Sequence, residues 1–507
     1  MNSETAQRLP FLRLALLTAA AVAIHGYHLG VDDAEIYIPA VSKLIHPDLF
    51  PFGAEFFESH EHLSLFAPIL AWTARLTHLS TDWTIFLWYV ATLFATLVSS
   101  WMLAALSFSS PRARWAATLA VTAAITMPAA NTGLLLMDPY LTARSFSTPL
   151  TLFVLTAFLA RRSLLAVSLA VITTMIHPQM MVYLLILLAV LWIMEKLTPA
   201  ASQSTAAASV ALLPAGFRFA PAQDPYREAL YARDFYFLFT WTWYDWLGLV
   251  APLAILWWFW KVRPRGITPV FLRLCLGLIP YGIISVIAAA VISSSHLFDM
   301  YARLQPLRCF HLVTFVFLIF FGGVVGEYAI VVGRWLFPVI CIGVATLMFY
   351  VERDLYPASP HIEWPWVQHT SNAWINTLLW VRHNTPHNAI FAVDSRYFAA
   401  DGVDRHGFRA IARRSELADY FKDGGVVAIF PALAVEWKQM TDATYGLNQF
   451  TVADFERLAR EYPVSWTVIH GPAPAGMQCP YQQQGYAVCS IPHAPGFGPA
   501  SSHVPQR

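Results

Sequence analysis

The sequence predicts a mainly α-helical polytopic membrane protein with a C-terminal α/β domain outside the bilayer. Three observations support this fold class. Of the 507 residues, 57% are hydrophobic and only 12% are charged, whereas about a quarter of the residues in soluble domains are charged. Long apolar runs separated by short basic segments recur up to about residue 351. Beyond that point the composition changes to a proline-rich stretch and then to alternating helix and strand patterns.

The apolar runs predict about 11 membrane spans, because a span needs about 20 apolar residues. The first run, "RLPFLRLALLTAAAVAIHGYHLG", has the basic flank and apolar core of a signal peptide. It lacks a clear cleavage site of small residues, so we interpret it as an uncleaved span. The other candidates lie near residues 83–107, 115–133, 145–160, 163–177, 179–195, 198–214, 243–260, 268–293, 308–327 and 335–351.

The basic residues predict the orientation of these spans, since Lys and Arg gather in cytoplasmic loops. If every candidate crosses, including the marginal Ala/Ser-rich segment near 198–214, the basic loops all fall on one side. They contain Arg8, Arg13, Arg112, Arg114, Arg161, Arg162, Lys196, Lys261, Arg263, Arg265 and Arg334. We therefore expect a multi-pass protein of the bacterial inner membrane, with a cytoplasmic N-terminus and a periplasmic or extracellular C-terminal domain.

The first predicted outer loop, residues 30–82, is acidic. It contains Asp32, Asp33, Glu35, Asp48, Glu55, Glu58 and Glu61, with little positive charge beyond Lys43 and Arg75. Within this loop, "DAEIYIPAVSKLI" and "HLSLFAPILAWTARLTHL" are amphipathic but too short or too polar to span the bilayer. Such segments favour helices that lie at the membrane interface. Two interfacial helices would hold the acidic turn near the bilayer surface.

The predicted domain boundaries place the membrane domain at 1–351, a linker at 352–369, an α/β domain at 370–492 and a disordered tail at 493–507. In the α/β domain, helices are expected at "SNAWINTLLWVRHNTP", "ELADYF" and "TVADFERLAREY", and strands at "NAIFAVD", "GVVAIFP", "SWTVIHG" and "YAVCSIP". Helices that alternate with apolar strands indicate a layered α/β domain. The sequence has no G-x-G-x-x-G or P-loop motif at a strand-to-helix turn, so nucleotide binding has no support.

Charge and cysteine usage bound the function further. The net charge is +1 and no polybasic run is present, so nucleic acid is not an expected partner. The cysteines of the predicted spans, Cys275, Cys309 and Cys341, are expected to behave as small hydrophobic residues, and no paired C-x-x-C zinc motif exists. Cys479 and Cys489 bracket "PYQQQGYAV" in the α/β domain. We expect them to form a disulfide, which fits an oxidising compartment.

The whole pattern resembles the GT-C class of membrane glycosyltransferases. The resemblance rests on an Asp pair in "DDAEIY" just after the first span, two interfacial helices, about 11 spans and an outer α/β domain. Members of that class move a sugar from a polyprenyl-phosphate carrier to an acceptor on the outer face. The chain lacks the W-W-D-Y-G-type motif of oligosaccharyltransferases. It is also similar to uncharacterised bacterial multi-pass proteins whose outer domain begins with a Trp-rich helix and an N-T-P turn, here Asn384, Thr385 and Pro386.

The aspartates of the acidic turn are the candidate catalytic residues. An inverting sugar transfer needs a carboxylate that accepts the proton of the acceptor hydroxyl, and Asp32 or Asp33 could be this base. Because adjacent side chains diverge in extended or turn geometry, we expect the other aspartate to bind a metal, cap a helix or face water. The alternative is that an Asp simply caps the helix that follows, with Glu35 as a favourable charge in its first turn. Glu35 is also a candidate for the substrate site.

Cations at the outer interface are candidates for binding the lipid phosphate. Arg308 is the first choice and Arg144 the second, and Arg303 is a further candidate, because the positive-inside rule predicts few arginines there. Their alternative roles are to reach the headgroups or to pair with Asp138 or Asp299. His177, in "TMIHPQM", could meet substrate or water at a short outer turn.

No cofactor is certain from the sequence, although a divalent metal such as Mg or Mn is compatible with the resemblance. The weak metal candidates are His60 and His62 in "ESHEH", which would share a face if that segment were extended; a solvated loop is the alternative. The expected partners are a polyprenyl-phosphate-linked sugar, membrane lipid and an acceptor glycan, lipid or protein. The alternative functions are a transporter or flippase, and a polymerase or ligase of surface polysaccharide.

Overall fold

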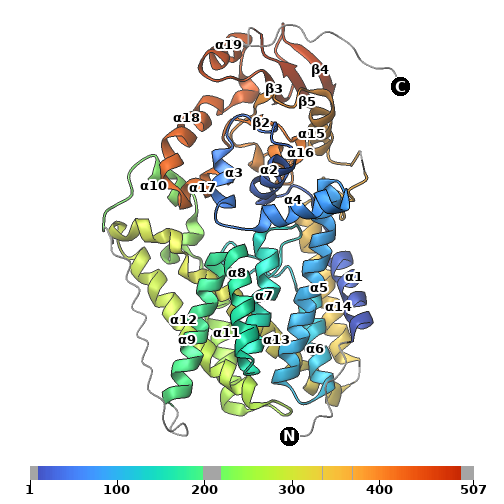
Figure 1. The fold of residues 1–507 in the computed structure, drawn as a ribbon, viewed down its shortest axis with the longest axis vertical. Helices are drawn as coiled ribbons and strands as arrows, with labels where there is room; N and C mark the ends of the chain where they lie inside the picture. Colours follow the sequence, from blue (N-terminus) through green and yellow to red (C-terminus); the bar gives the residue numbers. More distant parts are fainter. Residues whose placement is uncertain (1–9, 198–218, 334, 368, 493–507) are drawn as a thin grey trace. The chain divides into compact units, whose positions relative to one another are not determined.

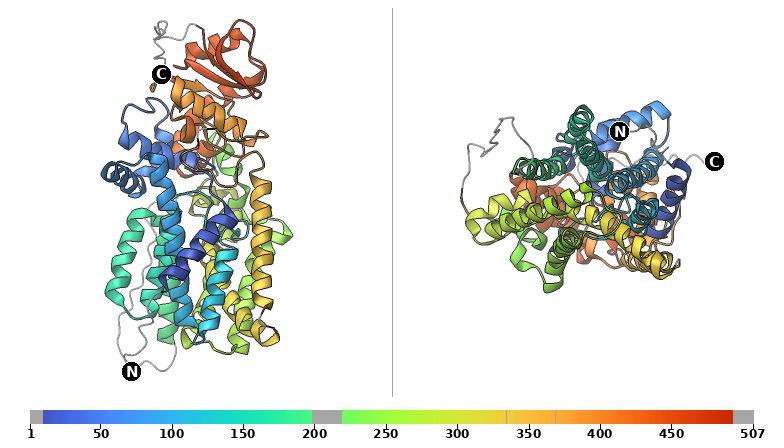
Figure 2. Two further views of the ribbon diagram at one scale, coloured as in Figure 1. Left: turned by 90° about the vertical axis from the view of Figure 1, so that its right-hand side faces the viewer. Right: turned by 90° about the horizontal axis from the view of Figure 1, so that it is seen from below.

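The computed structural model describes residues 10–197, 219–333, 335–367 and 369–492 of the chain (Figures 1 and 2). The chain divides into two compact units. We call Met1–Gly26, Phe86–Arg227 and Tyr231–Arg353 the helical unit, and Tyr27–Ile85, Glu228–Leu230 and Asp354–Arg507 the sheet unit.

Five helical segments are long and apolar enough to cross a membrane within the described residues. They are Thr81–Ser107, Pro178–Lys196, Pro269–Ser293, His296–Ala329 and Leu336–Leu355. The expectation of about 11 spans is therefore wrong for the described part of the chain. The candidates near 145–160 and 163–177 form apolar helices that are shorter than a span, as does the first candidate. The candidate at 198–214 lies outside the described residues. The apolar helices fit a membrane-embedded protein.

The main helices of the helical unit run roughly along one common direction in Figure 1. They are α1 (Phe11–His25), α5 (Thr81–Ser107, which begins in the sheet unit), α6 (Pro111–Ala123), α7 (Ala143–Leu159), α8 (Ser163–Ile176), α9 (Pro178–Leu197), α11 (Trp243–Val262), α12 (Pro269–Ser293), α13 (Phe310–Val332) and α14 (Leu336–Leu355). Short 3-10 helices occur at Asp234–Tyr236, Leu238–Thr240, His296–Leu304 (η3) and Pro306–Cys309 (η4), and a short helix, α10, spans Tyr226–Tyr231.

Small residues allow α6 and α13 to pack closely. A Cβ atom on Gly322 would lie 2.3 Å from the Cβ of Ala120, and one on Gly326 would lie 2.0 Å from the Cβ of Ala116. Any side chain at either glycine would therefore push the two helices apart. Such close contacts of small residues are the usual way in which helices associate in lipid, where the hydrophobic effect between helices is absent.

The sheet unit contains a five-stranded sheet in the order β2-β1-β3-β5-β4. Its strands are β1 (Ile390–Ala392), β2 (Ser415–Glu416), β3 (Trp466–His470), β4 (Gln478–Gln483) and β5 (Tyr486–Ser490). β1 is parallel to both β2 and β3, whereas β5 is antiparallel to β3 and β4. The helices of this part of the chain are α15 (Ala373–Asn384), α16 (Phe408–Ala412), α17 (Lys422–Ile429), α18 (Ala434–Thr444) and α19 (Val452–Glu461), with 3-10 helices at Tyr397–Ala399, Pro431–Leu433 and Leu447–Gln449.

Two of the elements expected in this domain are different in the structure. The segment "GVVAIFP" lies mostly in helix α17 and not in a strand, and "ELADYF" begins in strand β2 and continues as a turn rather than a helix. Short apolar runs carry no periodicity that separates a buried strand from a buried helix. By contrast, α15 and α19 form where they were predicted. Asn372 accepts a hydrogen bond from the Ile375 backbone at the start of α15, and Thr451 opens α19 with a capping box.

The acidic loop belongs to the sheet unit, although the sequence assigned it to the membrane domain. Residues 27–85 form α2 (Ala34–Ile45), α3 (Glu55–Glu61) and α4 (Phe66–Thr77). A parallel bridge pairs Tyr27 with Ile362, and an antiparallel bridge pairs Val31 with His406. Contacts between segments more than 300 residues apart leave no local signal in the sequence. The helices α2 and α4 match the two predicted amphipathic helices, and their position at a membrane interface stays a prediction.

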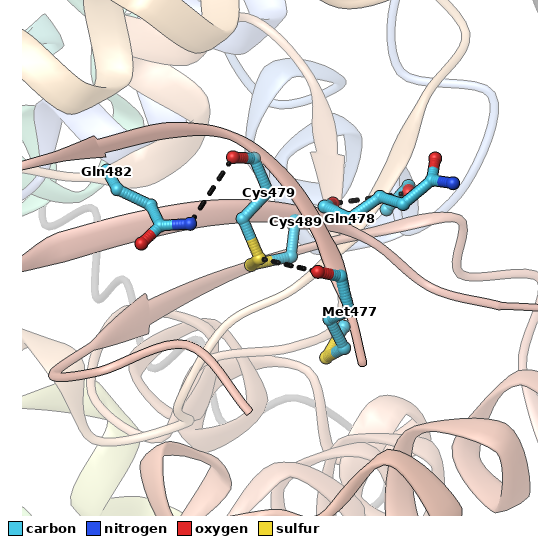
Figure 3. Close-up of a disulfide and its surroundings, with 6 residues drawn as sticks. Met477, Gln478, Cys479, Gln482 and Cys489 are labelled. Atoms are coloured by element: carbon cyan, nitrogen blue, oxygen red, sulfur yellow. Dashed lines mark hydrogen bonds between the residues drawn. A yellow bond between two sulfur atoms is a disulfide. The ribbon is translucent and has the colours of Figure 1, made fainter. Parts of the chain in front are cut away.

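The disulfide expected between Cys479 and Cys489 is present and joins β4 to β5 (Figure 3). Gln478 pairs with Ser490 in the antiparallel register, so the two cysteines lie next to each other on adjacent strands. The remaining cysteines, Cys275, Cys309 and Cys341, are free, and the first two are buried.

Candidate functional site

The acidic turn is held by the backbone of the C-terminal segment. Gly30 accepts a hydrogen bond from the Gly407 N–H at 2.8 Å, and the Asp32 N–H donates to the Arg405 carbonyl at 3.0 Å. Asp32 has a φ of 51°, in the left-handed region. Because a non-glycine residue pays a steric cost there, such positions are often found in turns that place a side chain for function. The turn therefore has one defined conformation within the sheet unit.

Both aspartates contact the same lysine. The Nζ atom of Lys422 lies 2.8 Å from Oδ1 of Asp32 and 3.1 Å from Oδ1 of Asp33. The two side chains therefore converge, contrary to the expectation that they diverge. Burial alone would lower the pKa of Lys422, but the two carboxylates outweigh it and raise this pKa above its ordinary value. Asp33 begins α2 without capping it through its side chain, so simple capping by Asp33 is not seen.

The two aspartates differ in exposure. The Asp33 side chain is 38% exposed and the Asp32 side chain 19% exposed. Asp32 also faces Arg405, whose Nη1 lies 4.0 Å from its Oδ2. Asp33 is therefore the carboxylate that solvent and a solute reach more easily.

Glu35 has a structural position in the interior and not a place at a substrate surface. Its Oε1 accepts hydrogen bonds from the backbone N–H and from Nε of Arg409, at 2.9 and 2.8 Å, and its Oε2 accepts one from the Ala410 N–H at 2.9 Å. The side chain is fully buried. A Cβ atom on Gly407 would lie 2.0 Å from Oε2 of Glu35, so this position needs glycine. Glu35 thus anchors α2 to the start of α16.

Arg409 is surrounded by four buried carboxyl groups. Besides Glu35, its guanidinium lies 2.6 Å from Asp423, 3.3 Å from Glu416 and 3.4 Å from Asp419. One cation cannot balance four charges in a buried place. Burial accordingly raises the pKa of Glu416 well above its ordinary value, and burial raises the pKa of Asp423 to about 8. The cluster therefore retains protons at neutral pH and joins α2, α16, β2 and α17.

A second buried cluster brings together His28, Glu363 and His406. Oε1 of Glu363 lies 3.0 Å from Nδ1 of His28 and 2.7 Å from Nε2 of His406, while Oε2 accepts the Leu29 N–H at 2.8 Å. Burial would raise the pKa of Glu363, but the charges and hydrogen bonds of the two histidines outweigh it and lower this pKa to about 2. Both imidazoles are completely buried.

The donor set of this cluster is of a metal-binding type, since two imidazoles and one carboxylate suit Zn²⁺, Mn²⁺ or Fe²⁺ better than Mg²⁺. The ligand atoms all lie within 4.8 Å of one another. Nδ1 of His406 faces the Val403 carbonyl at 3.1 Å, which is the outer contact that metal-binding histidines commonly make. The 2.7 Å separation of Nε2 from Oε1 is a hydrogen-bond length. In this geometry the His406 imidazole and the Glu363 carboxyl group form a hydrogen bond.

The metal candidates from the sequence are His60 and His62. His60 lies within helix α3 and His62 in the turn that follows. The segment is therefore not extended there, which was the condition for the expected shared face. His62 is exposed.

In the helical unit, the two leading phosphate candidates, Arg144 and Arg308, lie in the neighbourhood of the buried His311. Nε2 of His311 faces the Leu136 carbonyl at 3.0 Å. Arg144 forms an ion pair with Asp138, which was the alternative role considered for it. Arg308 has no ion pair within the described residues, and its Nε is buried without a hydrogen-bond partner.

The segment that carries Arg308 is fixed by Tyr183 of α9. The Tyr183 hydroxyl lies 2.8 Å from the Leu304 carbonyl and 3.1 Å from the Gln305 carbonyl, between η3 and η4. Arg303, the third candidate, is exposed. α8 ends at Ile176 and α9 begins at Pro178, so His177 lies at a break between the two helices. Whether that break meets substrate stays a prediction.

Sequence reasoning missed the partners of the acidic turn. Lys422 lies 389 residues beyond Asp33, and Glu363 lies 335 residues beyond His28. His28 lies close to the aspartates in the sequence, but nothing in the sequence indicates that it forms a cluster with the distant Glu363 and His406. No protein-family model matches the chain, and no curated protein matches it either.

Proposed function

We propose that the protein is a membrane glycosyltransferase that moves a sugar from a polyprenyl-phosphate carrier to an acceptor hydroxyl. The observation that carries this proposal is the acidic turn, in which Asp32 and Asp33 converge on Lys422. A carboxylate that is partly exposed and paired with a neighbouring cation suits a general base. Asp33, the more exposed of the two, is our choice for this role, and Asp32 positions Lys422.

The reaction would proceed by direct displacement. The acceptor oxygen forms a bond to the anomeric carbon while the bond from that carbon to the phosphate oxygen breaks. The proton of the acceptor hydroxyl passes to Asp33, and the electron pair of the broken bond leaves with the lipid phosphate. This leaving group gains charge, so a cation that binds it favours the transition state.

Arg308 is the proposed ligand of the lipid phosphate. It has no ion pair within the described residues, and a buried guanidinium nitrogen without a partner calls for an explanation. A phosphate oxygen would satisfy it, because Arg binds phosphate through paired N–H groups. Arg144 is already paired with Asp138. It would therefore attract the phosphate through its positive charge at longer range and not through a direct hydrogen bond.

The test compares Asp33→Asn with Asp32→Asn and with Asp401→Asn, an exposed aspartate of the same unit that serves as the matched control. Each full-length variant is purified, checked for equal thermal stability, and assayed for transfer of labelled sugar from a panel of polyprenyl-phosphate sugars in membrane extract. We expect Asp33→Asn to lose at least ~100-fold in rate, since general bases contribute about 10²–10⁴-fold. The Asp401→Asn control should match the wild type.

A wild type that is inert with every donor, or an Asp33→Asn variant as active as the wild type, would remove this proposal. A polymerase or ligase of surface polysaccharide is the second candidate, because Arg308, whose Nε is buried without a hydrogen-bond partner among the described residues, suits any enzyme that binds a lipid phosphate. That function predicts loss of activity in Arg308→Gln together with full activity in both aspartate variants.

A further inference from the structure

A cavity of about 230 Å³ lies in the sheet unit at the ends of two parallel strands. Asp394 and Arg396, which follow β1, and His470, the last residue of β3, line it. None of these residues takes part in the acidic turn or in the two buried clusters described above.

The topology of the sheet makes this position informative. From β1 the chain goes first to the parallel neighbour β2 on one side, and later to the parallel neighbour β3 on the other side. The carboxyl ends of β1 and β3 therefore form a switch point, where the connections leave in opposite directions. Open sheets with parallel strands bind their ligands at such points.

One wall of the cavity is aromatic. The ring of Trp374 lies 5.3 Å from that of Tyr397 and 5.4 Å from that of Tyr486, measured between centroids. The His470 ring is stacked on Tyr486 at 4.8 Å. Trp374, Tyr397 and Tyr486 are buried, so their positions are fixed before any ligand arrives.

The polar groups of the cavity are also fixed in advance. Oδ1 of Asp394 accepts a hydrogen bond from the Arg396 N–H at 2.9 Å. The Arg396 guanidinium lies over the rings of Tyr420 and Tyr445, at 4.5 and 5.1 Å from their centroids. The site thus offers one carboxyl group and one guanidinium, whose charges balance.

We propose that this cavity binds one neutral sugar ring of pyranose size. Pockets for drug-sized ligands measure about 300–1,000 Å³, so a cavity of about 230 Å³ suits a single ring. The apolar C–H face of a sugar packs on aromatic rings, and its hydroxyl groups bond both donors and acceptors. The balanced charge disfavours a free phosphate or a metal ion. If the proposed function holds, on which this identification rests, the bound ring is the sugar of the acceptor.

The experiment measures binding without turnover. The full-length chain is placed in lipid nanodiscs, because alkyl glycoside detergents would compete, and is exposed to the methyl glycosides of glucose, galactose, mannose and N-acetylglucosamine. Saturation-transfer NMR reports which probe binds. Ala399→Trp is designed to fill the cavity from an exposed lining position. The matched control is Val435→Trp, an exposed position on α18 away from the cavity.

We expect at least one glycoside to bind the wild type and Val435→Trp equally, and Ala399→Trp to weaken this binding at least fivefold. Arg396→Ala, a second variant, should weaken it at least threefold and decides the matter if Ala399→Trp does not fold. The proposal would be overturned if no glycoside bound the wild type, or if Ala399→Trp and Arg396→Ala both bound the glycoside as tightly as the wild type. Asp33→Asn should bind the glycoside like the wild type, which separates failure of this site from failure of the proposed transferase.

Discussion

At the scale of single residues, buried charge in the sheet unit is concentrated on a few side chains that come from distant parts of the chain. Glu363 is one of them. It accepts hydrogen bonds from two buried histidines and from the Leu29 N–H. Its contribution to stability therefore depends on its charge, and this dependence can be measured.

We expect Glu363→Gln to lower the free energy of unfolding by about 3 kcal/mol at pH 7, because breaking a buried ion pair costs about 3–5 kcal/mol. The folded state lowers the pKa of Glu363 from 4.5 to about 2. A carboxyl group with a lowered pKa stabilises the fold above its unfolded pKa, and this stabilisation is lost as pH falls through the folded value. The difference in the free energy of unfolding between variant and wild type should therefore be largest above about pH 5 and become smaller as the pH falls toward 2.

The measurement is thermal unfolding of the full chain in detergent between pH 3 and 8. Glu461→Gln, at an exposed carboxylate of α19, is the control and should follow the wild type at every pH. Equal stability of Glu363→Gln and wild type at pH 7 would show that the cluster does not carry a stabilising charge.

At the scale of elements, the packing of α6 against α13 depends on the absence of side chains. A Cβ atom on Gly326 would lie 2.0 Å from the Cβ of Ala116, so Gly326→Ala must separate the helices or move one of them. We expect a loss of about 1–3 kcal/mol, as is usual for overpacking. Gly343 on α14 is the matched control, since a Cβ atom there would meet nothing within 4 Å.

Gly343→Ala should be neutral or stabilise the protein by up to about 1 kcal/mol, because alanine is the better helix former. Both variants are compared by thermal unfolding in nanodiscs. If the two alanine variants had the same stability, the close approach of α6 and α13 would not limit the packing of the helical unit.

Helical spacing predicted its elements from the sequence, whereas apolar character alone gave mixed results. α15 has Trp374 and Leu378 at helical spacing, and both are buried in the structure. The apolar runs "NAIFAVD", "SWTVIHG" and "YAVCSIP" contain the predicted strands β1, β3 and β5. The "GVVAIFP" segment has only apolar character, which suits a strand and a helix equally, and it forms α17. The candidate site was also predicted only in part. The charges of Asp32 and Asp33 in an outer loop identified these residues from the sequence, whereas Lys422 was identified only from its contacts in the structure.

At the scale of the whole molecule, the C-terminal segment does not make a complete domain by itself. Its Arg409 bonds Glu35, its His406 lies in a cluster with His28, and its Arg413 forms an ion pair with Asp82. All three partners come from residues 27–85. Composition marks a boundary near residue 351, but the folding unit includes both sides of it.

We therefore predict that residues 354–492 expressed alone do not fold cooperatively, because Arg409 and His406 would lose buried partners and the surface that covers them. The test compares this segment alone with the same segment co-expressed with residues 27–85, using the dispersion of amide signals in NMR and the sharpness of thermal unfolding. Folding should be restored by the wild-type 27–85 segment and impaired when that segment carries Glu35→Ala, because Arg409 would then lose the carboxylate that accepts two of its N–H groups. The same segment with Glu58→Ala, which removes only a partly exposed ion pair to Lys43, is the control and should restore folding fully. A dispersed spectrum and a cooperative transition from residues 354–492 alone would show that the C-terminal part is an independent domain and that its contacts with the acidic loop contribute little to its stability.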